Sequence, residues 1–322
     1  MKSILRLATA IAVVAASHLS AHADQLSELR IDWATYNPVS LILKNDRILE
    51  KELEKDGIKV TWVQSAGSNK ALEFLSAGSL DFGSTAGAAA LIGRINGNPI
   101  KSIYVYSKPE WTALVTRKDT GISKVADLKG KSIAVTRGTD PHIFLVRALA
   151  DAGLTEKDVS LVLLQHADGR LALKRGDVAA WAGLDPIMAS AEIEDGDVLF
   201  HRNAANNTWG VLNVREEFAR QHPDVVKRVL KAYEQARAEA QKNPAKLKSE
   251  LVAATKLPDE VIARQLERTD LTNSAIGKEQ ASTIEAAGVA LQKAGVLKPE
   301  VDVAGTVSQL IDASYLSARV GQ

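Results

Sequence analysis

The 322-residue chain contains no cysteine, which excludes disulfide scaffolds, thiolate zinc sites, iron–sulfur clusters and cysteine nucleophiles together. A cationic excess is also absent, because 40 Lys and Arg residues face 39 Asp and Glu residues. A net charge of +1 gives no basis for holding a phosphate backbone, so we expect no nucleic-acid partner. The composition, 46% hydrophobic and 25% charged, is ordinary for a globular protein, and the length predicts about two domains or lobes.

Common catalytic signatures are missing too. The chain has no Gly-x-Ser-x-Gly turn and no Gly-x-x-x-x-Gly-Lys-Ser/Thr loop, and its histidines show no metal-ligand spacing. We therefore expect a protein that is not an enzyme and needs no cofactor or metal. An enzyme is the more distant alternative, because one fold can carry several functions.

The first 23 residues have the parts of a secretory signal peptide. Lys2 and Arg6 are basic, residues 7–16 are apolar but too few to span a bilayer, and residues 21–23 (Ala-His-Ala) form a small-x-small cleavage site. We predict cleavage after Ala23 and release of the exported chain. A membrane anchor is the alternative.

From Leu29 onward, short β-branched runs alternate with longer amphipathic runs. This alternation predicts an α/β fold with mainly parallel strands and helices on both faces of the sheets. The longest early amphipathic run predicts a single helix over 39–55, and the last run predicts a helix over 303–316.

The strands form two series, and no long Gly/Ser/Pro linker separates them. The first series ends near Tyr106, the second begins near Trp111, and the chain leaves the second series between Phe200 and Trp209. Two α/β lobes must therefore be joined by two short crossing segments, which predicts a two-segment hinge with a ligand cleft between the lobes.

Two segments, each ending a strand and starting a helix, predict main-chain sites for an anion. They are residues 82–87 (Phe-Gly-Ser-Thr-Ala-Gly) and 137–141 (Arg-Gly-Thr-Asp-Pro). A helix start has free N–H groups and a partial positive charge, and the hydroxyls of Ser84 and Thr85 add donors. Two opposed helix starts can hold a small oxyanion. The alternative is that Ser84 and Thr139 only cap their helices.

Two further polar residues stand at the second helix start. Asp140 is expected to cap the helix that opens with Pro141, and His142 is a weaker candidate donor to an anion. Taken alone, His142 is also compatible with an ordinary surface position.

Three tryptophans lie near predicted strand ends, in a chain with only 5% aromatic residues. A tryptophan at a cleft rim can pack an organic group and donate its indole N–H. Trp111 and Trp209 are candidates for this role, and ordinary core packing is their alternative. Trp181 lies in mid-strand and is expected in the core.

Four segments share a pattern with a known family. In lobe one, the segment is residues 77–85 (Ala-Gly-Ser-Leu-Asp-Phe-Gly-Ser-Thr). In lobe two, the segments are residues 125–135, which include Val-Ala-Asp-Leu-Lys-Gly-Lys; residues 137–154, which include Arg-Gly-Thr, His142 and Arg-Ala-Leu; and residues 176–186, which include Gly-Asp-Val-Ala-Ala-Trp-Ala and Asp-Pro. Together they resemble the aliphatic sulfonate-binding proteins of ABC importers, within the wider group that binds nitrate, sulfonate and taurine. The resemblance runs through most of the chain after residue 23.

The chain departs from this family pattern at three places. The family usually has a second tryptophan at the position of Leu184, and an acidic or proline-rich stretch where residues 86–90 are Ala-Gly-Ala-Ala-Ala. It favours Ser where this chain has Asp140. A carboxylate there would repel a sulfonate unless it turns away as a helix cap, or it would meet an amine on the ligand.

The resemblance implies a type II periplasmic binding protein fold. Lobe one would comprise residues 24–108 and 209–322, and lobe two residues 109–208. A ligand would bind between the lobes and close the hinge. The closed monomer would then dock in the periplasm on an inner-membrane ABC permease, whose cytoplasmic ATPase hydrolyses ATP.

The implied ligand is a small organic anion of the alkanesulfonate type, taken up for its sulfur. Taurine, an organic sulfate ester, nitrate and a thiamine-precursor pyrimidine are the alternatives. The expected ligand-binding residues comprise oxyanion donors, aromatic walls, an amide donor and two carboxylates for an amine: Tyr36, Asn37, Ser84, Thr85, Ala86, Glu110, Trp111, Gly138, Thr139, His142, Asp185, Asn207 and Trp209.

Overall fold

The structure is a computed structural model that describes residues 26–316. The predicted signal peptide and its cleavage site lie outside the described residues. Among the residues that are described, no helix is long and apolar enough to cross a membrane.

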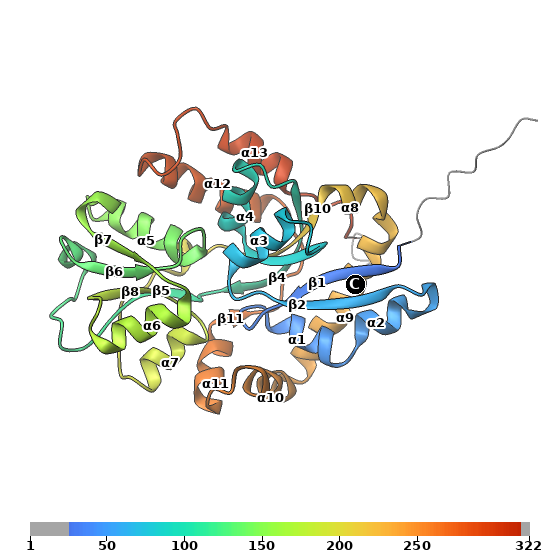
Figure 1. Ribbon diagram of the computed structural model, residues 1–322, viewed down its shortest axis with the longest axis horizontal. Coiled ribbons are helices and arrows are strands. Elements are labelled where there is room, and N and C mark those ends of the chain that lie inside the picture. The colour runs from blue at the N-terminus through green and yellow to red at the C-terminus, as the bar shows by residue number, and fades with distance from the viewer. Residues whose placement is uncertain (1–25, 317–322) are drawn as a thin grey trace, which may run out of the picture.

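Two separate β-sheets form the centres of two lobes (Figure 1). The lobe-one sheet has the order β11-β4-β10-β3-β1-β2. Its strands are β1 (Glu28–Trp33), β2 (Lys59–Gln64), β3 (Phe82–Ala86), β4 (Ile100–Pro109), β10 (Gly210–Arg215) and β11 (Thr269–Asp270). β1 pairs in parallel with β2 and β3, whereas β10 runs antiparallel between β3 and β4.

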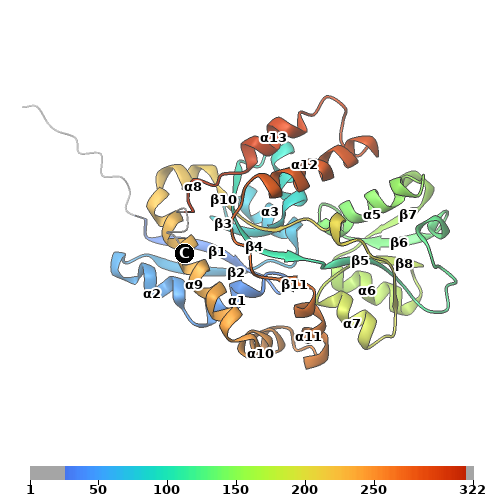
Figure 2. The same ribbon diagram turned by 180° about the vertical axis from the view of Figure 1, so that it is seen from behind.

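The lobe-two sheet has the order β7-β6-β8-β5-β9. Its strands are β5 (Thr112–Thr116), β6 (Ser132–Val135), β7 (Ser160–Leu163), β8 (Ala180–Leu184) and β9 (Val198–His201). Strands β6, β7 and β8 are parallel, and β5 runs antiparallel to β8 and β9. The chain enters this sheet from β4 and returns to lobe one through β10, so two segments connect the lobes (Figures 1 and 2).

Helices cover both sheets. Those of lobe one are α1 (Pro38–Asn45), α2 (Ile48–Leu53), α3 (Ser68–Ser76), α4 (Gly87–Ile95), α8 (Glu216–Gln221), α9 (Pro223–Lys242), α10 (Pro244–Thr255), α11 (Asp259–Glu267), α12 (Lys278–Lys293) and α13 (Val303–Leu310). Those of lobe two are α5 (Asp140–Asp151), α6 (His166–Arg175) and α7 (Ile187–Ile193). Figure 2 shows that α12 lies above α5 and α11 lies close to α7, so helices of the two lobes meet on both sides of the connecting strands.

Local sequence explains most element boundaries. α1 begins at Pro38, whose missing N–H is harmless at that position, and the side chain of Asn37 accepts a hydrogen bond from the Ser40 N–H at 3.3 Å. α6 ends at Arg175, and Gly176, which follows as the C-cap, adopts a positive φ of 82°. Burial of Trp181 in β8 confirms its predicted place in the core.

Two predicted helices are shorter than the sequence suggested. The expected helix over 39–55 breaks into α1 and α2, because Arg47 takes a left-handed conformation with φ of 54°. The expected helix over 303–316 ends at Leu310, because Ile311 forms a β-bridge with Ser102 instead. Apolar periodicity continues past both points, so it could not show either ending.

Close packing around β10 gives a stability prediction. A Cβ added at Gly210 would lie 2.4 Å from Cε2 of Tyr106 and 2.7 Å from Oγ of Ser107. Tyr106 is fully buried and cannot move aside, so Gly210→Ala should cost about 1–3 kcal/mol of unfolding free energy. Urea unfolding followed by circular dichroism measures this loss. The matched control is Gly277→Ala, where nothing lies within 4 Å, and an equal loss in both variants would contradict the packing argument.

Candidate ligand-binding site

The strand ends of the two lobes meet at one interface. The segment after β2 contacts the segment after β7, and the start of α5 contacts the segment before β10. Apolar side chains seal this interface, since Ile143 and Val146 of α5 share a hydrophobic cluster with Trp209 and Ile284 of lobe one. Two surface hollows of about 650 and 620 Å³ lie elsewhere, beside α2 and α9. Because strand ends, helix starts and apolar side chains of the two lobes are in contact, the lobes are closed on one another, and we take their interface as the candidate site.

Ser84 stands above a buried carboxylate that the sequence analysis missed. Asp32, the next-to-last residue of β1, accepts hydrogen bonds from the Ser84 N–H at 2.9 Å and from its Oγ at 2.9 Å. The Ser84 Oγ also accepts a hydrogen bond from the Asn37 amide at 2.8 Å, and Tyr36 donates to the Ser84 carbonyl at 3.0 Å. All four residues are buried. Burial raises the pKa of Asp32 to about 6, although the hydrogen bonds from Ser84 oppose this rise.

The neighbouring oxyanion candidates also have partners within the chain. The Thr85 Oγ1 accepts a hydrogen bond from the Asn213 amide at 2.8 Å, and the Ala86 N–H donates to the Ser68 Oγ at 3.0 Å. Both residues are fully buried in β3. These two contacts hold the strand end in place, and the Ala86 N–H already has its acceptor within the chain.

A second buried carboxylate joins the two lobes. Asp140 accepts hydrogen bonds from the Trp111 indole N–H at 2.8 Å, from the Thr208 Oγ1 at 2.7 Å and from the Thr208 N–H at 3.1 Å. Only 1% of Asp140 is exposed, and burial raises the pKa of its carboxyl group. Thr139 takes the N-cap position that was predicted for Asp140, and Asp140 is the first helical residue, free to reach across the interface.

The first N–H groups of α4 also have acceptors within the chain. The Gly87 N–H donates to the Trp209 carbonyl at 2.8 Å, and the Ala88 N–H donates to the Thr208 Oγ1 at 3.2 Å. A chain of contacts therefore runs from α4 through Thr208 to Asp140. The two helix starts are linked through Thr208, and the carboxylate that receives this link belongs to the chain itself.

The aromatic and amide candidates surround this carboxylate. Trp111 is 4% exposed and packs edge-on against Tyr36, with ring centroids 6.1 Å apart. Trp209 is also 4% exposed, and the Lys108 ammonium lies 4.9 Å from its ring centroid. The Asn207 side chain pins the two crossing segments together, because its Oδ1 accepts from the Thr112 N–H at 2.9 Å.

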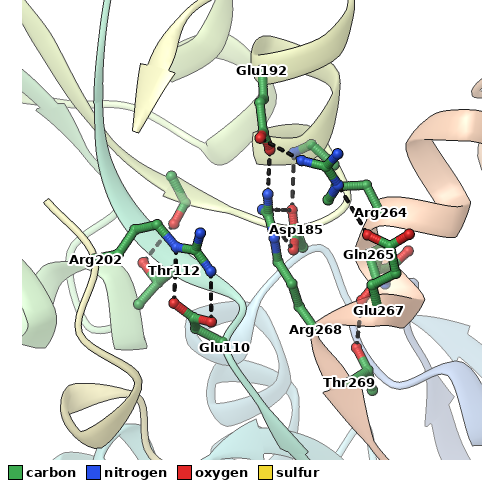
Figure 3. Close-up of polar contacts among 12 residues, drawn as sticks. Glu110, Thr112, Asp185, Glu192, Arg202, Arg264, Gln265, Glu267, Arg268 and Thr269 are labelled. Carbon is green, nitrogen blue, oxygen red and sulfur yellow. Dashed lines mark hydrogen bonds and ion pairs between the residues drawn. The ribbon is translucent and has the colours of Figure 1, made fainter. Parts of the chain in front are cut away.

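The two carboxylates predicted to meet a ligand amine are paired with arginines (Figure 3). Asp185 lies 3.4 Å from Nη1 of Arg268, which also binds Glu192 of α7, and Glu192 binds Arg264 of α11 as well. These pairs form an inter-lobe ion cluster between α7 and α11. Burial raises the pKa of Asp185 to about 7, and Arg268 opposes the rise.

Three candidates from the second predicted segment and the crossing segment lie away from the buried carboxylates. His142 makes a 2.8 Å contact with Glu156, whose pKa this contact lowers. Glu110 pairs with Arg202 through two contacts of 2.8 and 3.0 Å, and Gly138 forms a turn with a positive φ of 78°. Among residues 26–316, no cluster of three His, Cys, Asp or Glu side chains is placed to hold a metal.

Sequence reasoning missed the residues that complete the interface. They are Asp32, Gly67, His166, Thr208, Arg264 and Arg268. Asp32 is the single acid of residues 29–33 and stands between Ile31 and Trp33, a signal that could have singled it out. Gly67 follows a strand and precedes a helix, which is the same signal that identified residues 82–87.

Comparison with solved structures identifies the fold. The alkanesulfonate-binding protein of Xanthomonas axonopodis pv. citri, solved with bound MOPS, superposes with a TM-score of 0.81. The superposition covers 90% of this chain and 99% of that one at 24% sequence identity. The fold is therefore the periplasmic binding protein fold, with two α/β lobes joined by two connections.

Sequence comparison gives the family. Residues 53–247 match the model of the family described as NMT1/THI5 like, and the chain belongs to this family. A protein of Escherichia coli named as binding aliphatic sulfonates is 29% identical over 270 residues, which is 83% of this chain and 84% of the relative. The taurine-binding periplasmic protein of Escherichia coli is 28% identical over 226 residues, 68% of each chain.

The buried Asp32 predicts a pH dependence of stability. Its folded pKa of about 6 lies above the ordinary 3.8, so its contribution to stability is fully present below about pH 4 and is lost as pH rises through about 6. The unfolding free energy should fall by on the order of 3 kcal/mol across this range. Asp32→Asn should flatten the curve in urea titrations at several pH values. The exposed Asp151→Asn is the control, and an unchanged slope in Asp32→Asn would refute this assignment.

The inter-lobe ion cluster predicts a shift toward the open form when it is broken. Arg268 is 6% and Asp185 2% exposed at their side chains, so Arg268→Ala leaves a buried carboxylate unpaired only while the lobes are closed. The closed form should lose about 3 kcal/mol. Small-angle scattering should show a larger radius of gyration than in the exposed control Arg220→Ala. Identical scattering curves would show that the cluster does not hold the lobes together.

Proposed function

We propose that this protein is the periplasmic solute-binding component of an ABC importer and captures an organic sulfonate between its two lobes. The main support is the match to a sulfonate-binding protein over 83% of the chain, combined with helix starts from both lobes that meet at one interface. The lobes would comprise residues 24–108 with 209–322 and residues 109–208. The ligand-loaded monomer would deliver its cargo to the permease for sulfur acquisition.

The described residues supply the requirements of a closing mechanism. Donor groups and aromatic rings lie on both lobes, so a ligand that contacts both stabilises the closed form over the open form. The inter-lobe ion cluster and the Asp140 carboxylate would supply contacts that only the closed form makes. The more these inter-lobe contacts favour the closed form in the free protein, the more tightly the ligand would bind.

An organic ligand agrees with the interface better than bare nitrate or sulfate. Tyr36 and Trp111 pack together at the lobe interface and are buried while the lobes are closed, so a carbon chain would contact their rings when a ligand lies between the lobes. Nitrate and sulfate have no apolar part to use this surface. Taurine, a sulfate ester and a thiamine-precursor pyrimidine are the alternative organic ligands.

The alternative function is an enzyme on the same fold. The family relatives reported above are named as binding proteins. The buried Asp32 and Asp140 are engaged by Ser84, Trp111 and Thr208, which is a structural rather than a catalytic arrangement. We therefore propose that the bound ligand leaves unchanged.

A thermal-shift screen of the chain purified after export tests this function. The panel contains ethanesulfonate, taurine, a sulfate ester, nitrate, sulfate and a thiamine-precursor pyrimidine. A sulfonate at 100 times its dissociation constant should stabilise the fold by about 2.7 kcal/mol. Nitrate and sulfate should give no shift, because they leave the aromatic surface unused.

Two further readouts on the same samples complete the test. Mass spectrometry of the purified chain should give an N-terminus at Asp24, as cleavage after Ala23 requires. Mass spectrometry of the recovered ligand should show the unaltered sulfonate, and a product would establish the enzyme alternative. A shift with the pyrimidine and none with any sulfonate would overturn the sulfonate assignment.

A further inference from the structure

A second meeting point of the two lobes lies between the start of α3 and the start of α6. Gly67, the N-cap of α3, faces lobe two: a Cβ added there would lie 2.9 Å from Oδ1 of Asn69 and 3.1 Å from Nε2 of His166. Neither helix has a side-chain capping bond. This junction, formed by Gly67, Asn69, Gln165 and His166, is called the α3–α6 junction below.

The imidazole of His166 presents an unused acceptor at this junction. The Thr136 hydroxyl donates to the Leu164 carbonyl at 2.7 Å, so its single proton is committed. The 3.2 Å contact between Thr136 Oγ1 and His166 Nδ1 therefore requires that Nδ1 carries the proton. Nε2 is left with a lone pair and has no partner among residues 26–316, although only 2% of His166 is exposed.

Two amide oxygens share this condition. Oδ1 of Asn69 and Oε1 of Gln165 are buried and receive no hydrogen bond within the described part of the chain. Buried acceptors are normally satisfied, because leaving one without a donor forfeits its hydration. Nε2 of His166, Oδ1 of Asn69 and Oε1 of Gln165 could therefore each accept a hydrogen bond from a bound ligand. Burial also lowers the pKa of His166 to about 4, which keeps its ring neutral at neutral pH.

These acceptors disfavour the sulfonate itself at this place. A sulfonate has oxygen acceptors only, so it would face the Nε2 lone pair without forming a hydrogen bond. A hydroxyl or amino group on the carbon chain of a ligand differs from the sulfonate, because it can donate a hydrogen bond to Nε2. Gly67 has no side chain to cover the two acceptors, whereas a Cβ there would lie 2.9 Å from Oδ1 of Asn69 and 3.1 Å from Nε2 of His166.

We propose that the ligand of this protein carries an O–H or N–H donor on its carbon chain, and that this donor binds Nε2 of His166 and Oδ1 of Asn69. The substrate class is then a hydroxy- or aminoalkanesulfonate rather than a plain alkanesulfonate. This inference rests on the proposed function and refines it. His166, Asn69 and Gly67 set the specificity within that class.

Calorimetry with a matched pair of ligands tests this inference. Isethionate (2-hydroxyethanesulfonate) and ethanesulfonate differ by one hydroxyl, and taurine supplies the amino counterpart. The wild-type chain should bind isethionate or taurine at least tenfold more tightly than ethanesulfonate, because a site built for a donor rejects the analogue that lacks it. His166→Phe keeps an aromatic ring but removes the lone pair, and should reduce this preference to about one.

Two variants control for folding and for histidine loss. His222→Phe makes the same change at a half-buried histidine between α8 and α9, and should keep the wild-type preference. Gly67→Ala places a methyl group between the two acceptors while leaving His166 in place, and should also abolish the preference. The ¹⁵N signals of His166 give a readout without mutation. Nε2 should be unprotonated in the free chain, and its signal should move with isethionate but stay still with ethanesulfonate.

The outcomes separate this inference from the proposed function. Equal affinity of the wild-type chain for isethionate, taurine and ethanesulfonate would overturn the inference and leave the sulfonate assignment intact. A preference that survives in both His166→Phe and Gly67→Ala, or a protonated Nε2 in the free chain, would also overturn it. Absence of binding by all three sulfonates would overturn both proposals.

Discussion

The carboxylate of Asp140 is the interaction on which the closed arrangement depends. It lies between the starts of α4 and α5, whose partial positive charges both favour an anion, and three donors from Trp111 and Thr208 converge on it. Trp111 and Thr208 belong to the two segments that connect the lobes. One buried charge therefore couples the hinge segments to the helix start of lobe two, and through Thr208 to that of lobe one. Replacing this charge by a neutral side chain would leave the same donors facing each other.

This arrangement divides the lobe interface into regions of different chemistry. In the part beside β3 and β10, the carboxylates already have donors within the chain, since Ser84 donates to Asp32 and Thr208 donates to Asp140. The part between α7 and α11 is ionic. At the α3–α6 junction, three buried acceptor atoms have no hydrogen-bond partner among residues 26–316. Most polar groups at the interface are therefore already hydrogen-bonded before a ligand binds. The acceptors without partners at the α3–α6 junction are the groups that can select between ligands.

The sequence predicts the fold well, because strand and helix periodicities, helix-stopping glycines and family motifs all agree. The two predicted lobes are present as two sheets joined by two segments, and Trp181 lies in the core as predicted. The site is less predictable, because hydrogen-bond partners are chosen by tertiary contacts that no local pattern encodes. Ser84 and Asp140 were noticed as polar residues at helix starts, but their partners Asp32 and Thr208 lie 52 and 68 residues away. The inter-lobe arginines lie on a helix with no motif of its own.

The position of β10 has a consequence for how the chain acquires its fold. β3 and β4 do not pair with each other, because β10 lies between them and is the partner of both. All strands of the second sheet come from one continuous stretch, whereas the first sheet waits for residues 210–215. During synthesis the lobe that begins later is thus the first that can be completed. Until residue 215 is available, two hydrophobic strand edges of the earlier lobe stay unpaired, and such edges invite association with other chains.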